Sequence, residues 1–199
     1  MGFDALLGND RLKQNLTRSL SKGHVSHFYL ISGPEGSGKH TLAKLLAAAI
    51  LCQGEDKPCE VVRDACTPCR KVMDGSHPDF ITVDDPEKKT VTVDLIRQAR
   101  ADVYIQPNES EYKIYMFPRA QDMGLPGQNA LLKILEEPPK YGVFLLLTDN
   151  PDKLLPTVRS RCTELNMQAL PEDVLRSHLR REFPQAQEED ITAAIDRSG

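Results

Sequence analysis

Apolar runs alternate with helical patterns of apolar residues along most of this chain. The continuous apolar runs predict buried strands, and they lie at residues 28–31, 80–83, 113–117 and 143–147. The helical patterns lie before and between them, at residues 9–23, 39–51, 94–103 and 128–135. This alternation predicts an α/β fold in which helices flank a central, mainly parallel sheet.

The ends of two predicted helices carry recognisable signals. The first helix is expected to begin at Asn9 or Asp10, because either side chain can cap a helix N-terminus. Its apolar stripe consists of Leu12, Leu16 and Leu20. The helix at residues 128–135 is stopped by Pro138-Pro139, since proline cannot continue a helix.

The pattern changes after residue 162, where two helical segments follow each other with no strand between them. They lie at residues 171–181 and 188–197. We therefore predict a nucleotide-binding-like domain over residues 1–167 and the beginning of a small helical lid domain over residues 168–199. The sequence ends before a third helix could complete a small bundle, so we expect a fragment.

A glycine-rich segment joins the strand at residues 28–31 to the helix at residues 39–51. It reads Gly33-Pro34-Glu35-Gly36-Ser37-Gly38-Lys39. Glycines let backbone N–H groups turn toward an anion, the helix N-terminus adds its dipole, and the lysine reaches the outer phosphates. The segment therefore predicts a phosphate-binding loop; the alternative is a strand-to-helix turn that binds nothing. The candidate nucleotide-binding residues are Gly33, Gly36, Ser37, Gly38, Lys39, His40 and Thr41.

The residues that would hold Mg²⁺ beside such a loop are missing. A hydrolysing loop has Ser or Thr directly after the lysine, whereas this chain has His40, and Thr41 lies about 100° further round the helix. A second apolar strand should end in an acidic residue, but Pro118-Arg119 follow the strand at residues 113–117. A guanidinium there would repel a divalent cation. We predict a phosphate cradle that does not hydrolyse nucleotide.

Two other strand ends could supply a carboxylate for Mg²⁺. Asp84-Asp85 follow the strand at residues 80–83, which we expect at the periphery of the sheet. Thr148-Asp149 follow the strand at residues 143–147 and resemble a polar sensor position. Metal binding at either one would make the chain a working ATPase, which stays open as an alternative.

Four of the five cysteines lie close together in a segment that we expect to be rich in loops. The candidate metal ligands are Cys52, Cys59, Cys66 and Cys69. The last two have the x2 spacing that lets two thiolates bind one ion, and four thiolates would close a tetrahedral zinc site. A redox pair of Cys66 and Cys69, or four free thiols, are the alternatives. We expect His77 to be a surface or capping residue, and Cys162, at the head of an apolar strand, to lie in the core.

Composition narrows the function classes further. The 25 Lys and Arg against 29 Asp and Glu leave a formal charge of −4, which excludes a polybasic, phosphate-neutralising tail. With no basic aromatic stripe, DNA contact by this chain alone has little support. No apolar run approaches the length of a membrane span, so no membrane partner is expected. The first residues lack a secretory signal, and a cytoplasmic location is the expectation.

Several strings resemble one known family. Asn129-Ala130-Leu131-Leu132-Lys133-Ile134-Leu135-Glu136-Glu137-Pro138-Pro139 and Ser160-Arg161-Cys162, with the phosphate-binding loop and the cysteine module, resemble bacterial clamp-loader AAA+ proteins. The resemblance covers about residues 7–167. ATPase subunits of that family keep an Asp-Glu pair where this chain has Pro118-Arg119, so the chain resembles the delta-prime class of DNA polymerase III clamp-loader subunits, whose own nucleotide site is commonly degenerate.

The resemblance implies a fold, partners and roles for particular residues. It implies an AAA+ P-loop domain, partner ATPase (gamma/tau) and delta subunits, and, through the complex, the sliding clamp and primed DNA. Arg161 matches the arginine that projects to the γ-phosphate bound by a neighbouring subunit, with Arg159 as the alternate. Thr148 matches the first polar sensor. The family's oligomerising collar lies beyond this sequence.

The resemblance also implies structural zinc, although the family usually has x2 between the second and third cysteines and this chain has x6. For the nucleotide site it implies ATP or no nucleotide at all. Two other functions stay open. One is an active, gamma/tau-like ATPase that uses Asp84 or Asp85 for metal, and the other is a nucleotide-dependent interaction module unconnected with replication.

Overall fold

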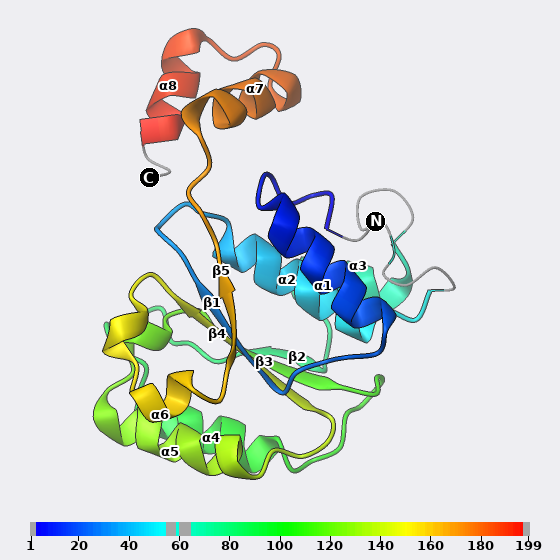
Figure 1. The fold of residues 1–199 in the computed structure, drawn as a ribbon, viewed down its shortest axis with the longest axis vertical. Helices are drawn as coiled ribbons and strands as arrows, with labels where there is room; N and C mark the ends of the chain where they lie inside the picture. The colour runs from blue at the N-terminus through cyan, green and yellow to red at the C-terminus, as the bar shows by residue number, and fades with distance from the viewer. Residues whose placement is uncertain (1–2, 55–58, 60–64, 197–199) are drawn as a thin grey trace.

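In the part of the chain that the structure describes, five parallel strands form one sheet, as the alternating pattern predicts (Figure 1). The computed structural model describes residues 3–54, 59 and 65–196. The strands are β1 (Phe28–Ser32), β2 (Phe80–Thr82), β3 (Lys113–Phe117), β4 (Gly142–Thr148) and β5 (Thr163–Asn166), in the order β2-β3-β4-β1-β5. Each neighbouring pair is parallel, so the carboxyl ends of all five strands share one edge of the sheet.

Helices cover both faces of the sheet (Figure 1). One face carries α1 (Asp10–Ser21), α2 (Lys39–Leu51) and α3 (Thr67–Asp74). The other carries α4 (Val93–Asp102), α5 (Leu125–Glu136) and α6 (Pro156–Arg159). Two 3₁₀ turns, η1 (Ala120–Asp122) and η2 (Pro151–Lys153), follow β3 and β4. The described helices and strands confirm the α/β prediction.

The central strands are buried on both faces, which explains their continuous apolar sequences. In β1, Tyr29 and Ile31 pack beneath the helices of the first face, while Phe28 and Leu30 pack beneath those of the second. The rings of Phe28 and Phe144 stack with centroids 4.6 Å apart, joining β1 to β4. Two hydrophobic cores therefore sandwich the sheet.

The sheet edges differ from the prediction. The strand after Cys162 was expected to be apolar, but β5 is an edge strand in which only Leu165 is buried. Cys162 itself is half-buried against the second core. At the other edge lies β2, three residues long, which confirms the peripheral place expected for the strand before Asp84. An edge strand has one neighbour, so it needs fewer apolar residues than a central strand.

The starts of two helices also differ from the prediction, whereas α1 begins at Asp10 as expected but lacks the predicted side-chain cap. Helix α5 begins three residues before the predicted position, at Leu125, because Pro126 stands in its first turn, where a missing N–H costs nothing. Helix α3 begins inside the predicted loop-rich cysteine segment, with Pro68 in its first turn. Asn9 occupies the N-cap position of α1, but its side chain makes no capping hydrogen bond and accepts one from the Gln168 N–H instead, at 3.0 Å.

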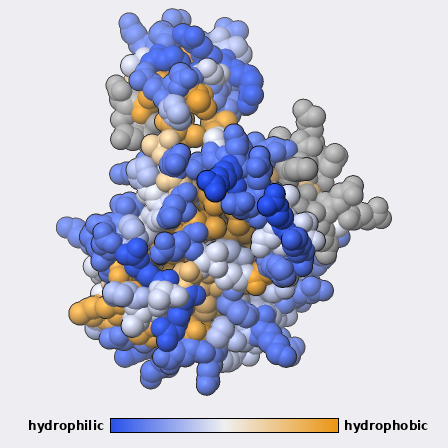
Figure 2. Space-filling model, viewed as in Figure 1, coloured by the Kyte–Doolittle hydropathy of each residue, from blue (hydrophilic) through white to orange (hydrophobic). Residues whose placement is uncertain are grey.

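The last two helices form a separate unit above the sheet (Figure 1). Helix α7 (Glu172–Glu182) packs against α8 (Glu188–Asp196). Arg176 of α7 forms an ion pair with Glu188 of α8 that joins the two helices, and a second pair with Glu172 within α7. Figure 2 shows this unit covered mainly by hydrophilic residues. Both predicted helices are confirmed within the described residues; the predicted end at Arg197 lies outside them. The division into domains at residues 167 and 168 stays a prediction.

Within the described residues, no helix combines the length and the apolar character needed to cross a membrane.

Candidate functional site

The glycine-rich loop lies at the carboxyl ends of β1 and β4, between β1 and α2. Gly33 follows β1 directly, and its N–H donates to the carbonyl oxygen of Thr148 at 3.2 Å. A Cβ atom on Gly33 would lie 2.8 Å from both the Met167 backbone oxygen and Ser37 Oγ, so a larger residue there would force its neighbours to shift. Gly38, the N-cap of α2, has φ of 85°, a conformation that side chains other than glycine rarely adopt. The loop therefore has the backbone shape that its sequence predicts.

Lys39 is held over this loop. Its Nζ atom donates to the carbonyl oxygens of Gly33 at 2.8 Å and Pro34 at 2.7 Å. Within the described residues it forms no ion pair with a carboxylate. Burial lowers the pKa of Lys39, although the charges of Asp149 and Glu35 oppose the shift. A partly desolvated ammonium group without an ion-pair partner, at a helix N-terminus, is suited to an anion.

The other candidate residues of the loop face different surroundings. Ser37 is 1% exposed, and its Oγ atom has no hydrogen-bond partner among the described residues. His40 and Thr41 stand in the first turn of α2 and are exposed. Burial, followed by the charges of Lys39 and Lys44, lowers the pKa of His40, with Asp84 opposing. These effects favour the neutral form of the imidazole ring.

Arg119, directly after β3 and Pro118, binds the loop that follows β2. Its Nη2 atom donates to Asp84 Oδ1 at 2.6 Å, and its Nε atom lies 3.2 Å from the same oxygen. Nη2 also donates to the backbone oxygens of Asp85 and Lys88, each at 3.0 Å. The Asp84 side chain is only 17% exposed, and its Oδ1 atom also accepts a hydrogen bond from the Asp85 N–H at 2.9 Å. The hydrogen bond to Asp84 raises the pKa of Arg119.

These residues do not fit Mg²⁺, which prefers an octahedron of oxygen ligands. The residue after Lys39 presents an imidazole, and the strand that should end in a carboxylate ends beside a guanidinium. Asp84 is bound by Arg119, and the Asp85 carboxylate pairs with Lys88 at 3.1 Å. Two further carboxylates are exposed: Asp149 at the end of β4 and Glu35 in the loop itself. The described residues around the loop therefore do not form a set of oxygen ligands for a magnesium ion.

Thr148, the predicted polar sensor, is fully buried at the end of β4 and pairs in register with Ser32 of β1. Its Oγ1 atom accepts a hydrogen bond from the Asn150 N–H at 3.1 Å. The hydroxyl thus stabilises the turn after β4, next to the phosphate-binding loop.

The four clustered cysteines converge on one point beside α2 and α3. The Sγ atoms of Cys52 and Cys59 lie 3.2 Å apart, those of Cys52 and Cys66 3.9 Å, and those of Cys66 and Cys69 3.4 Å. All four Sγ atoms lie within 4.8 Å of one another. Zinc with four thiolates at about 2.3 Å needs sulfur atoms about 3.8 Å apart, so this set fits a tetrahedral ion.

The thiols of the cluster differ in how readily they ionise in the absence of a metal. The backbone N–H groups of Cys69 and Gln53 and the thiols of Cys69 and Cys59 outweigh burial and lower the pKa of Cys66 to about 6. Burial raises the pKa of Cys59 and of Cys69. The x6 spacing does not prevent convergence of the thiols; residues 55–58 and 60–64, within this segment, lie outside the described residues.

Cys162 lies apart from this cluster. Its Sγ atom donates to the Val158 carbonyl oxygen at 3.3 Å, and burial raises its pKa to about 12. A protonated thiol of this kind serves packing and is suited neither to metal binding nor to nucleophilic chemistry.

The sequence did not reveal a buried carboxylate at Asp79. Its two oxygens accept hydrogen bonds from the backbone N–H groups of Asn108 at 2.6 Å, Glu109 at 2.8 Å and Ser110 at 3.0 Å. Despite the opposing effect of burial, these bonds lower the pKa of Asp79. Of the two roles expected for His77, the surface position was wrong, because the residue is 3% exposed, whereas the ring does cap the backbone by accepting a hydrogen bond from the Asp79 N–H. The pair holds the segment before β3.

The two arginines near the end of α6 differ in their partners. Arg159 pairs with Asp152 at 2.8 Å and lies 3.7 Å from Glu164. Arg161 is exposed, and its Nη1 atom donates to the Thr157 carbonyl oxygen at 2.9 Å. In the part of the chain that the structure describes, Arg161 has no carboxylate within ion-pair distance. Its charge is therefore available to a group outside this part of the chain.

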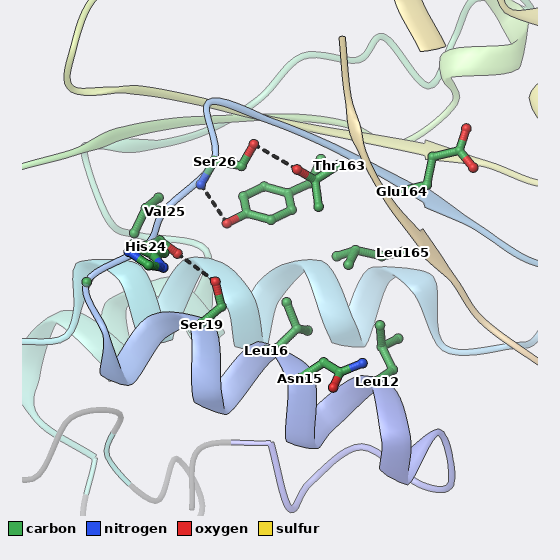
Figure 3. Close-up of a pocket in the computed structure, with 12 residues that line it drawn as sticks. Leu12, Asn15, Leu16, Ser19, His24, Val25, Ser26, Thr163, Glu164 and Leu165 are labelled. Carbon is green, nitrogen blue, oxygen red and sulfur yellow. Dashed lines mark hydrogen bonds between the residues drawn. The ribbon is translucent and has the colours of Figure 1, made fainter. Parts of the chain in front are cut away.

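A groove of about 660 Å³ lies between α1 and the β5 edge (Figure 3). Leu12 and Leu16 of α1 point toward Leu165 of β5 across it. The Thr163 hydroxyl donates to Ser26 Oγ at 2.9 Å, one of several bonds that polar groups of the lining make with each other. The groove contains none of the predicted site residues.

The fold and the glycine-rich loop define the AAA+ P-loop class of proteins. Among solved structures, the chain is similar to a DNA polymerase III gamma subunit-related protein from Thermotoga maritima, with a TM-score of 0.57, 21% identity, and coverage of 93% of this chain and 57% of that one. It is also similar to the Thermotoga maritima RuvB Holliday junction branch migration motor, with a TM-score of 0.54, 16% identity, and coverage of 87% and 50%. At these identities the likeness shows the fold alone.

A comparison of the sequence with protein-family models shows the family of this chain. Residues 8–171 match the protein-family model described as DNA polymerase III, delta subunit. The chain belongs to this family, which places it in the clamp-loader group of DNA polymerase III proteins.

Curated relatives agree with this placement. Subunit tau of DNA polymerase III from Bacillus subtilis (strain 168) is 34% identical over 170 residues, covering 84% of this chain and 29% of the relative. Subunit gamma from Buchnera aphidicola subsp. Schizaphis graminum is 31% identical over 180 residues, covering 89% and 48%. The chain spans less than half the length of these two relatives.

Proposed function

We propose that this chain is a delta-prime-type subunit of the bacterial DNA polymerase III clamp loader, which helps load the sliding clamp onto primed DNA without hydrolysing ATP itself. Its partners in this proposal are the gamma/tau ATPase subunits and the delta subunit, and the clamp and DNA are reached through the complex. The observation that carries the proposal is the pair of Arg119 and Asp84. This pair stands where an ATPase of the family needs free carboxylates.

Arg161 would contribute chemistry to a neighbouring subunit. Negative charge spreads over the equatorial oxygens of a phosphoryl group during its transfer, and an arginine from a second subunit stabilises that charge. Arg161 suits this role because it is exposed and free of ion pairs among the described residues, whereas Arg159 is paired with Asp152. A subunit that cannot hydrolyse nucleotide in its own site can still accelerate hydrolysis at its neighbour's.

The cysteine cluster would support this subunit structurally. Four thiolates leave no open coordination position on zinc, so the ion would stabilise the fold and would not catalyse a reaction. Cys69 belongs to α3, and its Sγ atom lies 3.3 Å from the Ala48 carbonyl oxygen of α2, so the cluster lies where these two helices meet on one face of the sheet.

The test is ATP turnover by a reconstituted loader that contains the full-length protein. Arg161→Ala should abolish turnover at the neighbouring site, since such arginines contribute about 10³–10⁵-fold to the rate. Arg161→Lys should restore little, because lysine lacks the planar fork of donors. Arg159→Ala is the matched control and should leave that site active. Assembly is followed by size-exclusion chromatography, and unchanged turnover by an assembled Arg161→Ala loader would contradict the proposal.

A second candidate is an active ATPase of the gamma/tau type. The names of the relatives favour it, and so does the charge of Asp149, which acts on Lys39. The two candidates differ in one measurement. Under the leading proposal the isolated chain releases no phosphate from ATP with Mg²⁺, whereas phosphate release that requires both Mg²⁺ and Lys39 would establish the ATPase.

A further inference from the structure

We infer that the loop at residues 33–39 binds the phosphates of a nucleoside triphosphate without a divalent cation. The inference deepens the proposed function and rests on its view of the chain as a non-hydrolysing subunit. It concerns the protein's own nucleotide site, whereas the proposed action of Arg161 concerns its neighbour's.

The loop retains the parts that bind an anion. The close approach of Gly33 to Met167 and the positive φ of Gly38 preserve the turn that directs N–H groups inward. Lys39 donates only to carbonyl oxygens of the loop, so its positive charge lacks an ion-paired counterpart among the described residues. A phosphate group would satisfy both the lysine and the N-terminus of α2.

The carboxylates after β2 are already occupied by cationic side chains. The three bonds from Arg119 to Asp84 are charge-assisted, and removing the guanidinium would leave a carboxylate that is 17% exposed without its partner. Asp85 is likewise paired with Lys88. A divalent cation would have to displace these cations and remain beside the guanidinium of Arg119.

His40 presents a different chemistry from the usual hydroxyl. A Ser or Thr hydroxyl at this position would ligate Mg²⁺ through oxygen, whereas neutral imidazole offers one N–H donor and one nitrogen acceptor. The charged groups that act on the ring are Lys39, Lys44 and Asp84. In the first turn of α2, a neutral ring can donate its N–H to a phosphate oxygen where the hydroxyl would have bound metal.

The experiment is calorimetric titration of ATP into the full chain, in excess magnesium chloride and in excess EDTA. In EDTA the ligand titrated is metal-free ATP with its full negative charge, and in magnesium chloride it is the Mg–ATP complex. We expect the Kd in EDTA to be equal or lower, because Lys39 and the helix N-terminus attract the greater charge. Tenfold tighter binding in magnesium, about 1.4 kcal/mol, would overturn the inference.

Three variants test which residues bind the phosphates and which make binding independent of magnesium. Lys39→Ala should abolish binding in both solutions. The double variant His40→Thr/Arg119→Asp restores an oxygen ligand and a carboxylate, and it should bind at least about tenfold tighter with magnesium than with EDTA. The matched control is His40→Thr/Arg97→Asp, because Arg97 pairs with Asp94 on the exposed face of α4; its binding should stay independent of metal. Circular dichroism confirms that each variant is folded, and if the double variant is not, the wild-type comparison decides.

The binding inference and the proposed role of Arg161 are tested by different measurements, so either can be contradicted without the other. If the chain binds ATP in neither solution, the inference is overturned, but turnover by the loader still decides the role of Arg161. If Arg161→Ala leaves turnover unchanged while ATP binds equally in EDTA and magnesium, the proposed function fails and the binding inference stands.

Discussion

The guanidinium of Arg119 lies 2.6 Å from Asp84, an acid 35 residues earlier in the chain. The sequence predicted that Arg119 would repel a divalent cation. The structure adds that the same side chain also occupies the carboxylate that could have attracted one. Arg119 further binds the backbone at Asp85 and Lys88, so it joins the loop after β2 to the end of β3.

A double-mutant cycle on Arg119 and Asp84 should show coupling. We expect Arg119→Met and Asp84→Asn to interact by about 1–2 kcal/mol in the free energy of unfolding, because both side chains are largely buried. The matched pair is Arg97→Met and Asp94→Asn, whose side chains are 61% and 76% exposed and should couple by less than about 0.5 kcal/mol. Urea unfolding measures both cycles, and equal couplings would contradict the structural role given to Arg119.

From the cysteine cluster we predict that the protein binds zinc in a fixed ratio to the chain. Purified protein should contain about one zinc per chain by elemental analysis, since four thiolates complete one tetrahedral site. Cys69→Ser should lose most of the metal and lower the thermal midpoint, because Cys69 is fully buried on α3 where that helix meets α2. Cys162→Ser, outside the cluster, should keep its zinc. Full metal content in Cys69→Ser would exclude the predicted ligand set.

Asp79 predicts a contribution to stability that depends on pH. Its pKa is lowered in the folded state, so the carboxylate stabilises the fold above its unfolded pKa, and this contribution is lost as the pH falls through the folded value. Asp79→Asn should therefore cost about 2–4 kcal/mol at pH 7, and the difference from wild type should shrink below about pH 4. Urea unfolding across this range is the measurement. A difference that stays constant into strong acid would rule out this account.

Gly33 predicts a steric effect at the phosphate-binding loop. Gly33→Ala places a methyl group 2.8 Å from the Met167 backbone oxygen, so the loop or the segment directly after β5 must shift. We expect a loss of about 1–3 kcal/mol, typical of overpacking. In the control Gly124→Ala, the new methyl meets the Pro126 ring at an ordinary contact distance of 3.7 Å, so it should cost much less. Thermal unfolding compares the two, and equal midpoints would show that the loop tolerates a side chain.

The elements that the sequence predicted best are those whose burial is complete. Strands β1, β3 and β4 are buried along their whole length, so their apolar runs are unbroken and their positions follow directly. The phosphate-binding loop is local, because its shape depends on glycines within seven residues. The convergence of the four cysteines was a prediction from spacing, and their Sγ atoms do come together.

The relationships that escaped prediction join residues far apart in the sequence. Asp79 is bound by Asn108, Glu109 and Ser110, about thirty positions later, and nothing near it in the sequence marks the partnership. The pairing of Arg119 with Asp84 escaped for the same reason. Helix α3 was missed because it is short and starts inside a segment whose cysteines disrupt the apolar periodicity; Pro68, in its first turn, was the available signal.

The short, mostly polar edge strands of the sheet also affect how copies of this protein associate. A long, apolar edge strand would present unpaired backbone groups as a template for aggregation. Here β2 has three residues, and β5 has four, of which Thr163, Glu164 and Asn166 are exposed. Neither edge strand presents a long row of unpaired backbone groups beside apolar side chains. Two molecules at high concentration therefore have little opportunity to pair their edge strands with each other.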